Sequence, residues 1–130
     1  MAVKAYPGNY NWEEAQIKCS QDGTDVNGEL PAPRSPTDNR WFVDKAHELG
    51  LNSFWLGIND RDVEGEYTNQ HGSPHNFLRW NMRNPTGDSD TTERDCVRTG
   101  GAQGYKWDDI KCTNTIGVLC TNVKGKAVSI

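Results

Sequence analysis

The sequence has no hydrophobic run long enough to span a membrane and no apolar stretch at its start that would serve as a secretory signal. It also has no block of lysine or arginine, because its 14 basic side chains are spread along the chain and are outnumbered by 18 acidic ones. The formal net charge is -4. We therefore expect no membrane span and no nucleic-acid partner, and we interpret the chain as a mature one with an added initiator Met.

The short motifs of common catalytic chemistry are missing as well. There is no Gly-Xaa-Ser-Xaa-Gly and no glycine loop that would cradle a phosphate. His71 and His75 are four residues apart, but Gly72-Ser73-Pro74 between them excludes the helix that a metalloprotease zinc motif needs. These absences predict a binding protein and not an enzyme.

The cysteines are few, and their spacing does not suit zinc. Neither a Cys-Xaa-Xaa-Cys pair nor a cysteine–histidine spacing typical of zinc sites is present. Disulfides in an oxidising compartment fit best, which predicts a secreted, extracellular protein. A length of 130 residues is typical of one domain, so we expect residues 1–130 to fold as a single unit. Three pairings are open to the four cysteines: Cys19, Cys96, Cys112 and Cys120.

Two helices are expected in the first half of the chain. Asn11 is a good N-cap with Glu14 as its capping-box partner, and the first helix has an apolar side formed by Trp12, Ala15, Ile17 and Cys19.

For the second helix, Ser35 is the predicted cap, Pro36 takes the first helical position, and Gly50 lies just past the end. Its core-facing residues are expected to be Phe42, Ala46 and Leu49.

Strands are predicted from short apolar runs between turn residues. Residues 3–6 read as a short strand that Pro7-Gly8-Asn9 closes. Residues 54–58 and 116–120 have the continuous hydrophobicity of fully buried strands.

Carboxylates are concentrated in the later part of the chain. Calcium is the natural candidate for holding so many hard oxygen donors, because it accepts six to eight oxygens in flexible geometry. A solvated acidic loop is the alternative, and the neighbouring tryptophans and cysteines favour a loop attached to the core. The residues concerned are Asp88, Asp90, Glu93, Asp95, Asp108 and Asp109.

An ordered set of motifs resembles the C-type lectin-like domain, over roughly residues 12–120. The resemblance implies a compact α+β fold with two helices flanking antiparallel sheets, chain ends close together, a long irregular loop region, and the disulfides Cys19–Cys120 and Cys96–Cys112. The motifs that carry it are Trp55-Leu56-Gly57-Ile58, Trp80 with Pro85, Asp95-Cys96-Val97, Trp107-Asp108-Asp109 with Cys112, and Cys120.

The same resemblance implies a principal calcium site. Trp107-Asp108-Asp109 is similar to the family's Trp-Asn-Asp motif, and Asn84-Pro85-Thr86 falls on its Glu-Pro-Asn or Gln-Pro-Asp triplet. Arg94 stands where the family has a carboxylate. We expect Glu93 to supply that ligand instead, with Asp88 or Asp90 as the alternative.

An auxiliary calcium site is implied with a closer match, and its ligands would be Asp60, Glu64, Asp95 and Asp88.

Two function hypotheses follow. The first is a calcium-dependent carbohydrate-binding protein that recognises glycans through Asn84, Glu93 and Asp108. Under this hypothesis Tyr105 contacts the sugar, and Arg94 favours an acidic or sulfated glycan. A homodimer would raise the avidity for a surface that carries several glycans. The second is a relative that binds a protein, ice or a mineral surface, with calcium structural or absent.

Overall fold

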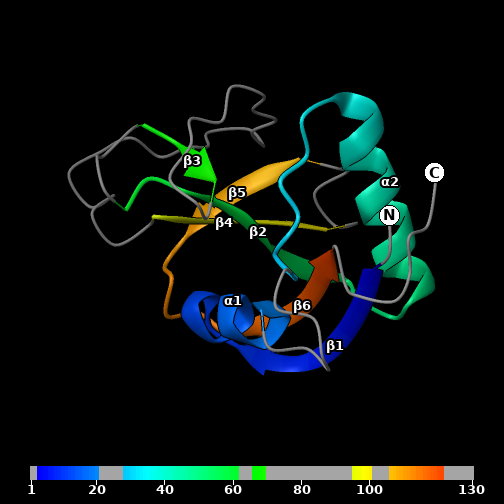
Figure 1. Ribbon diagram of the computed structural model, residues 1–130, viewed down its shortest axis with the longest axis horizontal. Coiled ribbons are helices and arrows are strands. Elements are labelled where there is room, and N and C mark those ends of the chain that lie inside the picture. Colours follow the sequence, from blue (N-terminus) through cyan, green and yellow to red (C-terminus); the bar gives the residue numbers. More distant parts are fainter. Residues whose placement is uncertain (1–2, 21–27, 62–65, 70–94, 101–105, 122–130) are drawn as a thin grey trace.

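The structure, a computed structural model, describes residues 3–20, 28–61, 66–69, 95–100 and 106–121. Figure 1 shows two helices and six strands in this part of the chain. In chain order they are β1 (Val3–Tyr10), α1 (Trp12–Ser20), α2 (Pro36–Glu48), β2 (Ser53–Asn59), β3 (Thr68–Asn69), β4 (Cys96–Gly100), β5 (Trp107–Ile110) and β6 (Ile116–Thr121).

The described strands form one sheet in the order β1-β6-β2-β4-β5, with β3 paired to β2. The sheet is mixed, because β2 runs parallel to β6 at Phe54 and Gly117 while the other pairs are antiparallel. The expected α+β fold with two flanking helices is confirmed, and this one pair is the parallel exception among the antiparallel pairs that the resemblance implies. Parallel pairing is possible because a long stretch of chain, residues 60–115, separates β2 from β6. The first and last described strands pair, Val3 with Thr121, as the resemblance implies.

Strand β2 is buried on both of its faces. Phe54, Leu56 and Ile58 belong to one hydrophobic cluster, and Trp55 belongs to a second. Successive side chains of a strand point to opposite faces, so the two clusters lie on opposite sides of the sheet. The predicted buried strands at residues 54–58 and 116–120 are both confirmed.

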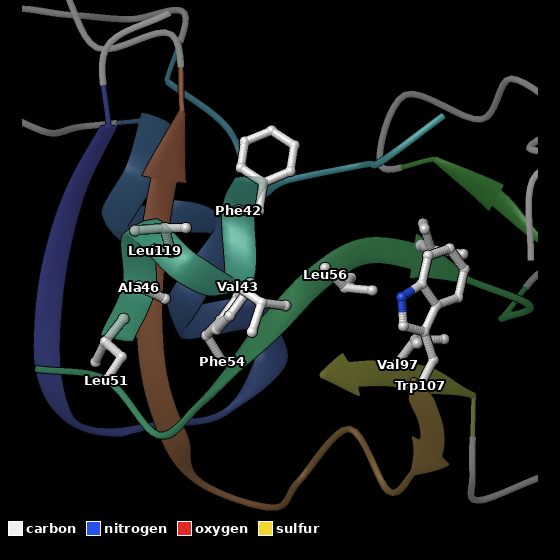
Figure 2. Close-up of a cluster of buried hydrophobic side chains, with 10 residues drawn as sticks. Phe42, Val43, Ala46, Leu51, Phe54, Leu56, Val97, Trp107 and Leu119 are labelled. Atoms are coloured by element: carbon white, nitrogen blue, oxygen red, sulfur yellow. The ribbon is translucent and has the colours of Figure 1, made fainter. Parts of the chain in front are cut away.

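Each helix covers one face of this sheet. Helix α2 contributes Phe42, Val43 and Ala46 to the cluster on one face, and Figure 2 shows Val43 beside Phe54 of β2. Helix α1 contributes three residues to the cluster on the other face: Trp12, Ala15 and Cys19. No helix in the described ranges is long and apolar enough to cross a membrane.

Both predicted helix starts are confirmed. The Asn11 side chain accepts from the Glu14 N–H at 2.8 Å and Glu14 accepts from the Asn11 N–H at 2.9 Å, so the capping box is complete. The Ser35 hydroxyl accepts from the Asp38 N–H at 3.1 Å, with Pro36 in the first turn.

Three expectations about elements were wrong. Ile17 is 52% exposed because it lies on the side of α1 away from the buried Ala15 and Cys19. Leu49 is 42% exposed because it is the C-cap just beyond the last residue of α2. The first strand continues past Pro7-Gly8-Asn9 to Tyr10, with a register irregularity after Tyr6. Such an irregularity accommodates Pro7, which has no N–H to donate to the hydrogen bonds between the strands.

Three buried tryptophans each donate their indole N–H to a different element. Trp12 donates to the Leu56 carbonyl at 2.9 Å and thereby attaches α1 to β2. Trp55 donates to the Tyr10 carbonyl at 2.8 Å. Because a buried indole N–H without an acceptor costs free energy, these bonds fix how the elements pack.

The third of these bonds joins β5 to α2. Trp107 donates its indole N–H to the Asn39 side-chain oxygen at 2.9 Å, and both residues are buried. This bond lies beside the two carboxylates that follow Trp107 in the sequence.

Both disulfides implied by the resemblance are present. Cys19–Cys120 connects α1 to β6 across 101 residues, and Cys96–Cys112 connects the start of β4 to the residues just after β5 across 16. The second bridge lies next to Asp95 in the sequence, so it also constrains the position of that residue.

We predict that Asn39→Ala lowers the free energy of unfolding by about 1 to 3 kcal/mol, because the Trp107 N–H stays buried and loses this acceptor. Urea denaturation followed by tryptophan fluorescence measures the loss. The control is Thr37→Ala, an exposed position on the same helix, which should change stability by less than about 0.5 kcal/mol. Equal losses for the two variants would contradict this role of Asn39.

Candidate functional site

Four of the predicted site residues lie in the described part of the chain, and all four are aspartates: Asp60, Asp95, Asp108 and Asp109. Two lie at the ends of neighbouring strands and two lie within β5. The other predicted site residues fall outside the described residues, so their roles stay predictions: Glu64, Asn84, Asp88, Glu93, Arg94 and Tyr105.

Asp60 and Asp95, which we call the strand-end carboxylates, are brought together by the pairing of β2 with β4. Asn59 is paired with Cys96, and the Asp60 N–H donates to the Asp95 carbonyl at 3.0 Å just beyond that pair. Asp60 is only 2% exposed and Asp95 is half-buried. Carboxylates removed from water in this way are paired with a cation or coordinate a metal.

Asp108 and Asp109, which we call the β5 carboxylates, are placed by the pairing of β4 with β5. Asp109 lies opposite Val97, and Asp108 lies opposite Arg98. The Thr99 hydroxyl donates to the Lys106 carbonyl at 2.9 Å and holds the same two strands one residue further along. Both carboxylates are buried, at 7% and 1% exposure, although each carries a formal charge.

The two β5 carboxylates are consecutive in the strand and have different neighbours on β4. Asp108 shares its face with Arg98, and their side chains form an ion pair with 3.4 Å between Nη2 and Oδ2. The Arg98 side chain is 32% exposed and that of Asp108 is 11% exposed. Asp109 lies opposite Val97, which belongs to the cluster beneath α2.

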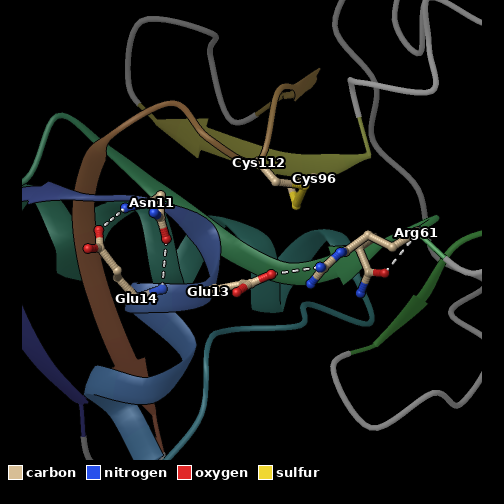
Figure 3. A network of polar contacts seen from close by, with 7 residues as sticks. Asn11, Glu13, Glu14, Arg61, Cys96 and Cys112 are labelled. Carbon is tan, nitrogen blue, oxygen red and sulfur yellow. Dashed lines mark hydrogen bonds and ion pairs between the residues drawn. A yellow bond between two sulfur atoms is a disulfide. The ribbon is translucent and has the colours of Figure 1, made fainter.

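A second arginine lies beside the strand-end carboxylates. Arg61 follows Asp60, donates its backbone N–H to the Asn59 side chain at 3.1 Å, and forms an ion pair with Glu13 of α1 at 2.8 Å (Figure 3). Its guanidinium also lies 5.3 Å from the centre of the Trp12 ring. These contacts attach the end of β2 to α1. The ion pair is largely exposed, so its own contribution to stability is small.

The donor set is chemically suited to calcium. Carboxylate oxygens are its preferred protein ligands, and Asp60 and Asp95 supply them from adjacent strand ends. Within the described ranges, however, no three His, Cys, Asp or Glu side chains gather into a group that could hold a metal ion. The described aspartates therefore fit as part of a calcium site that needs further ligands.

Arg98 is the residue near the site that the sequence reasoning missed. It lies two positions after Cys96 in β4, and the other described side chains of that strand are uncharged. A single charged residue in a short, otherwise uncharged strand was the sequence feature that could have pointed to it. Its partner became visible only with the register of β4 and β5, because strand pairing decides which side chains face each other.

Residues 8–122 match the family model described as the lectin C-type domain. The chain belongs to the C-type lectin domain family. It is 31% identical over 118 residues to mouse C-type lectin domain family 3 member A, which corresponds to 89% of this chain and 57% of the mouse protein. This chain therefore spans little more than half the length of that relative.

Solved structures of the family share the fold. The mouse scavenger receptor C-type lectin carbohydrate-recognition domain has a TM-score of 0.74 and 22% identity, with 92% of this chain and 89% of that one covered. The herring type II antifreeze protein has a TM-score of 0.75 and 18% identity, with 91% and 87% covered. At these identities the likeness shows the C-type lectin fold and not the ligand.

We predict that replacing Cys96 and Cys112 together by alanine loosens β5 selectively. The chain-entropy model gives a loss of about 3 kcal/mol for a loop of this length. Amide hydrogen exchange should accelerate at Asp108 and Asp109 more than at Ala46 in α2, because the bridge holds the residues after β5 to β4.

The matched control removes Cys19 and Cys120 instead, which disconnects α1 from β6. Exchange should then accelerate in β6 more than in β5. If both double variants loosened β5 to the same degree, the local role of the Cys96–Cys112 bridge would be wrong.

Proposed function

We propose that this protein is a secreted carbohydrate-binding protein whose loop-bound calcium coordinates sugar hydroxyls. The observation that supports it most is the burial of three aspartates, Asp60, Asp108 and Asp109, with the half-buried Asp95 beside Asp60, in a chain of the C-type lectin domain family. Buried carboxylates at this density need cations, and calcium is the cation that such oxygen donors select.

The proposed ligands fall into two groups. The principal site takes Asp108 and Asp109 from β5 together with Asn84 and Glu93. The auxiliary site takes Asp60 and Asp95 from the strand ends together with Glu64 and Asp88. The residues proposed to contact the sugar itself are Asn84, Glu93, Arg94, Asp108 and Tyr105.

Binding needs no bond chemistry in this proposal. When present, calcium offers coordination positions to two adjacent hydroxyls of a sugar. Asp108 and its neighbours hold that ion and accept hydrogen bonds from the same hydroxyls, so a sugar lacking one of them leaves a buried polar group unpaired. Selectivity therefore follows from hydroxyl geometry.

The expected partners are glycans or glycoconjugates, and the net charge of -4 does not favour nucleic acid. Members of the family are typically non-enzymatic binding proteins, and we propose the same of this chain. A homodimer would suit the function because two weak sites presented together bind a multivalent surface more tightly than one.

A second candidate function is binding of a protein, ice or a mineral surface with calcium structural or absent. The ion pair of Arg98 with Asp108 favours it, because one carboxylate of the proposed principal site already has a cationic partner. The shared fold with an antifreeze protein is compatible with it.

A glycan array probed in millimolar calcium and again in EDTA tests the proposed function. We expect signal on a coherent class of sugars in calcium and none in EDTA, because the ion is part of the sugar contact. Absence of signal in both conditions would remove the sugar hypothesis for the glycans tested. Binding that persists in EDTA would favour the second candidate.

The matched variants for this array are Asp109→Asn and Asp44→Asn. Both replace a carboxylate by an amide of the same shape, but Asp109 is buried in β5 and Asp44 is exposed on α2. Asp109→Asn should lose most of the calcium-dependent signal, while Asp44→Asn should keep it. Circular dichroism of both variants separates a lost ligand from a lost fold.

A further inference from the structure

The ion pair between Arg98 and Asp108 joins two directly opposed residues of β4 and β5, which lie on the same face of the sheet. Arg98 has its guanidinium turned toward the carboxylate, and its Nε is buried with no acceptor among the described residues. The side chain of Asp108 is 11% exposed, so water screens this pair less than it would screen a surface pair.

A guanidinium and a divalent cation compete for such a carboxylate. Arginine stays protonated at all relevant pH values, so its charge cannot be removed when another cation arrives. Two positive centres at the same partly buried oxygens repel each other strongly, because the effective dielectric there is lower than in water. One of them must move away or bind more weakly.

The geometry of the pair makes Arg98 the group that moves. The distance of 3.4 Å between Nη2 and Oδ2 exceeds the 2.7 to 2.9 Å that is usual for charge-assisted hydrogen bonds. The arginine side chain is also the more exposed of the two, at 32%, so solvent can receive it. Asp108 is held in β5 between Trp107 and Asp109, all of them buried.

We propose that Arg98 is an internal competitor for calcium: it binds the Asp108 carboxylate when calcium is absent and must be displaced before Asp108 becomes a ligand. This inference rests on the proposed function, and it assigns Arg98 the role of setting calcium affinity. The pair keeps the buried charge of Asp108 compensated in the calcium-free protein, and it raises the calcium concentration at which the site fills.

The test is isothermal titration of calcium into the chelator-treated wild-type protein and into Arg98→Met. The substitution keeps the length of the aliphatic side chain and removes the charge. The Kd for calcium should fall by about 3- to 10-fold, which is the range expected for losing a partly buried ion-pair partner. Arg98→Gln serves as a second neutral variant if Arg98→Met fails to fold by circular dichroism.

Lys18→Met is the charge-matched control, since it also removes one positive charge but lies on α1, which packs on β1, β2 and β6. Its Kd for calcium should stay within about twofold of wild type. A double-mutant cycle then isolates the pair: in the Asp108→Asn background, Arg98→Met should change the Kd at least about threefold less than it does in the wild type.

The outcomes separate this inference from the proposed function. Equal Kd values for wild type and Arg98→Met would overturn the competitor role while leaving calcium binding intact. An equal effect of Arg98→Met in both backgrounds would also overturn it, because the effect would not pass through Asp108. If neither protein took up calcium, the proposed calcium site and this inference would both be wrong.

Discussion

The constraint on which the rest of the structure depends is the burial of β2 on both faces. Its aromatic and aliphatic side chains point alternately into two clusters, so each face needs its own cover, which α2 and α1 provide. The three strands that pair with β2, namely β3, β4 and β6, are then fixed by its hydrogen bonds. The indole bonds of Trp12 and Trp55 leave little freedom in how these layers pack.

The candidate site follows from where this frame ends. Strand β2 stops at Asn59 opposite Cys96, and Asp60 and Asp95 therefore meet directly beyond the sheet. Pairing of β4 with β5 places Asp108 against Arg98, and the Cys96–Cys112 bridge closes the same region. Negative charge is thus concentrated at the ends of β2 and β4 and within β5, and two arginines, Arg61 and Arg98, lie among these aspartates.

Much of the fold could be predicted because the sequence features that indicate it are local. The caps at Asn11 and Ser35 and the buried run at residues 54–58 need only a few neighbouring residues to be read, and the family resemblance supplied the disulfide pairing. Ile17 was misplaced because it lies on the side of α1 opposite the buried Ala15, and Leu49 because α2 ends one residue before it. The ion pair of Arg98 could not be predicted, since it depends on the register of strands separated by a loop. The parallel pairing of β2 and β6 is equally non-local.

The central claim is that the buried aspartates around β2, β4 and β5 belong to a calcium site in the folded protein. The most direct test is the thermal unfolding midpoint in EDTA, in excess magnesium and in excess calcium. Calcium that binds only the folded state at 100 times its Kd should add about 2.7 kcal/mol and raise the midpoint on the order of 10 °C, whereas magnesium should have little effect because it demands smaller, octahedral geometry. Identical midpoints in all three solutions would contradict the account.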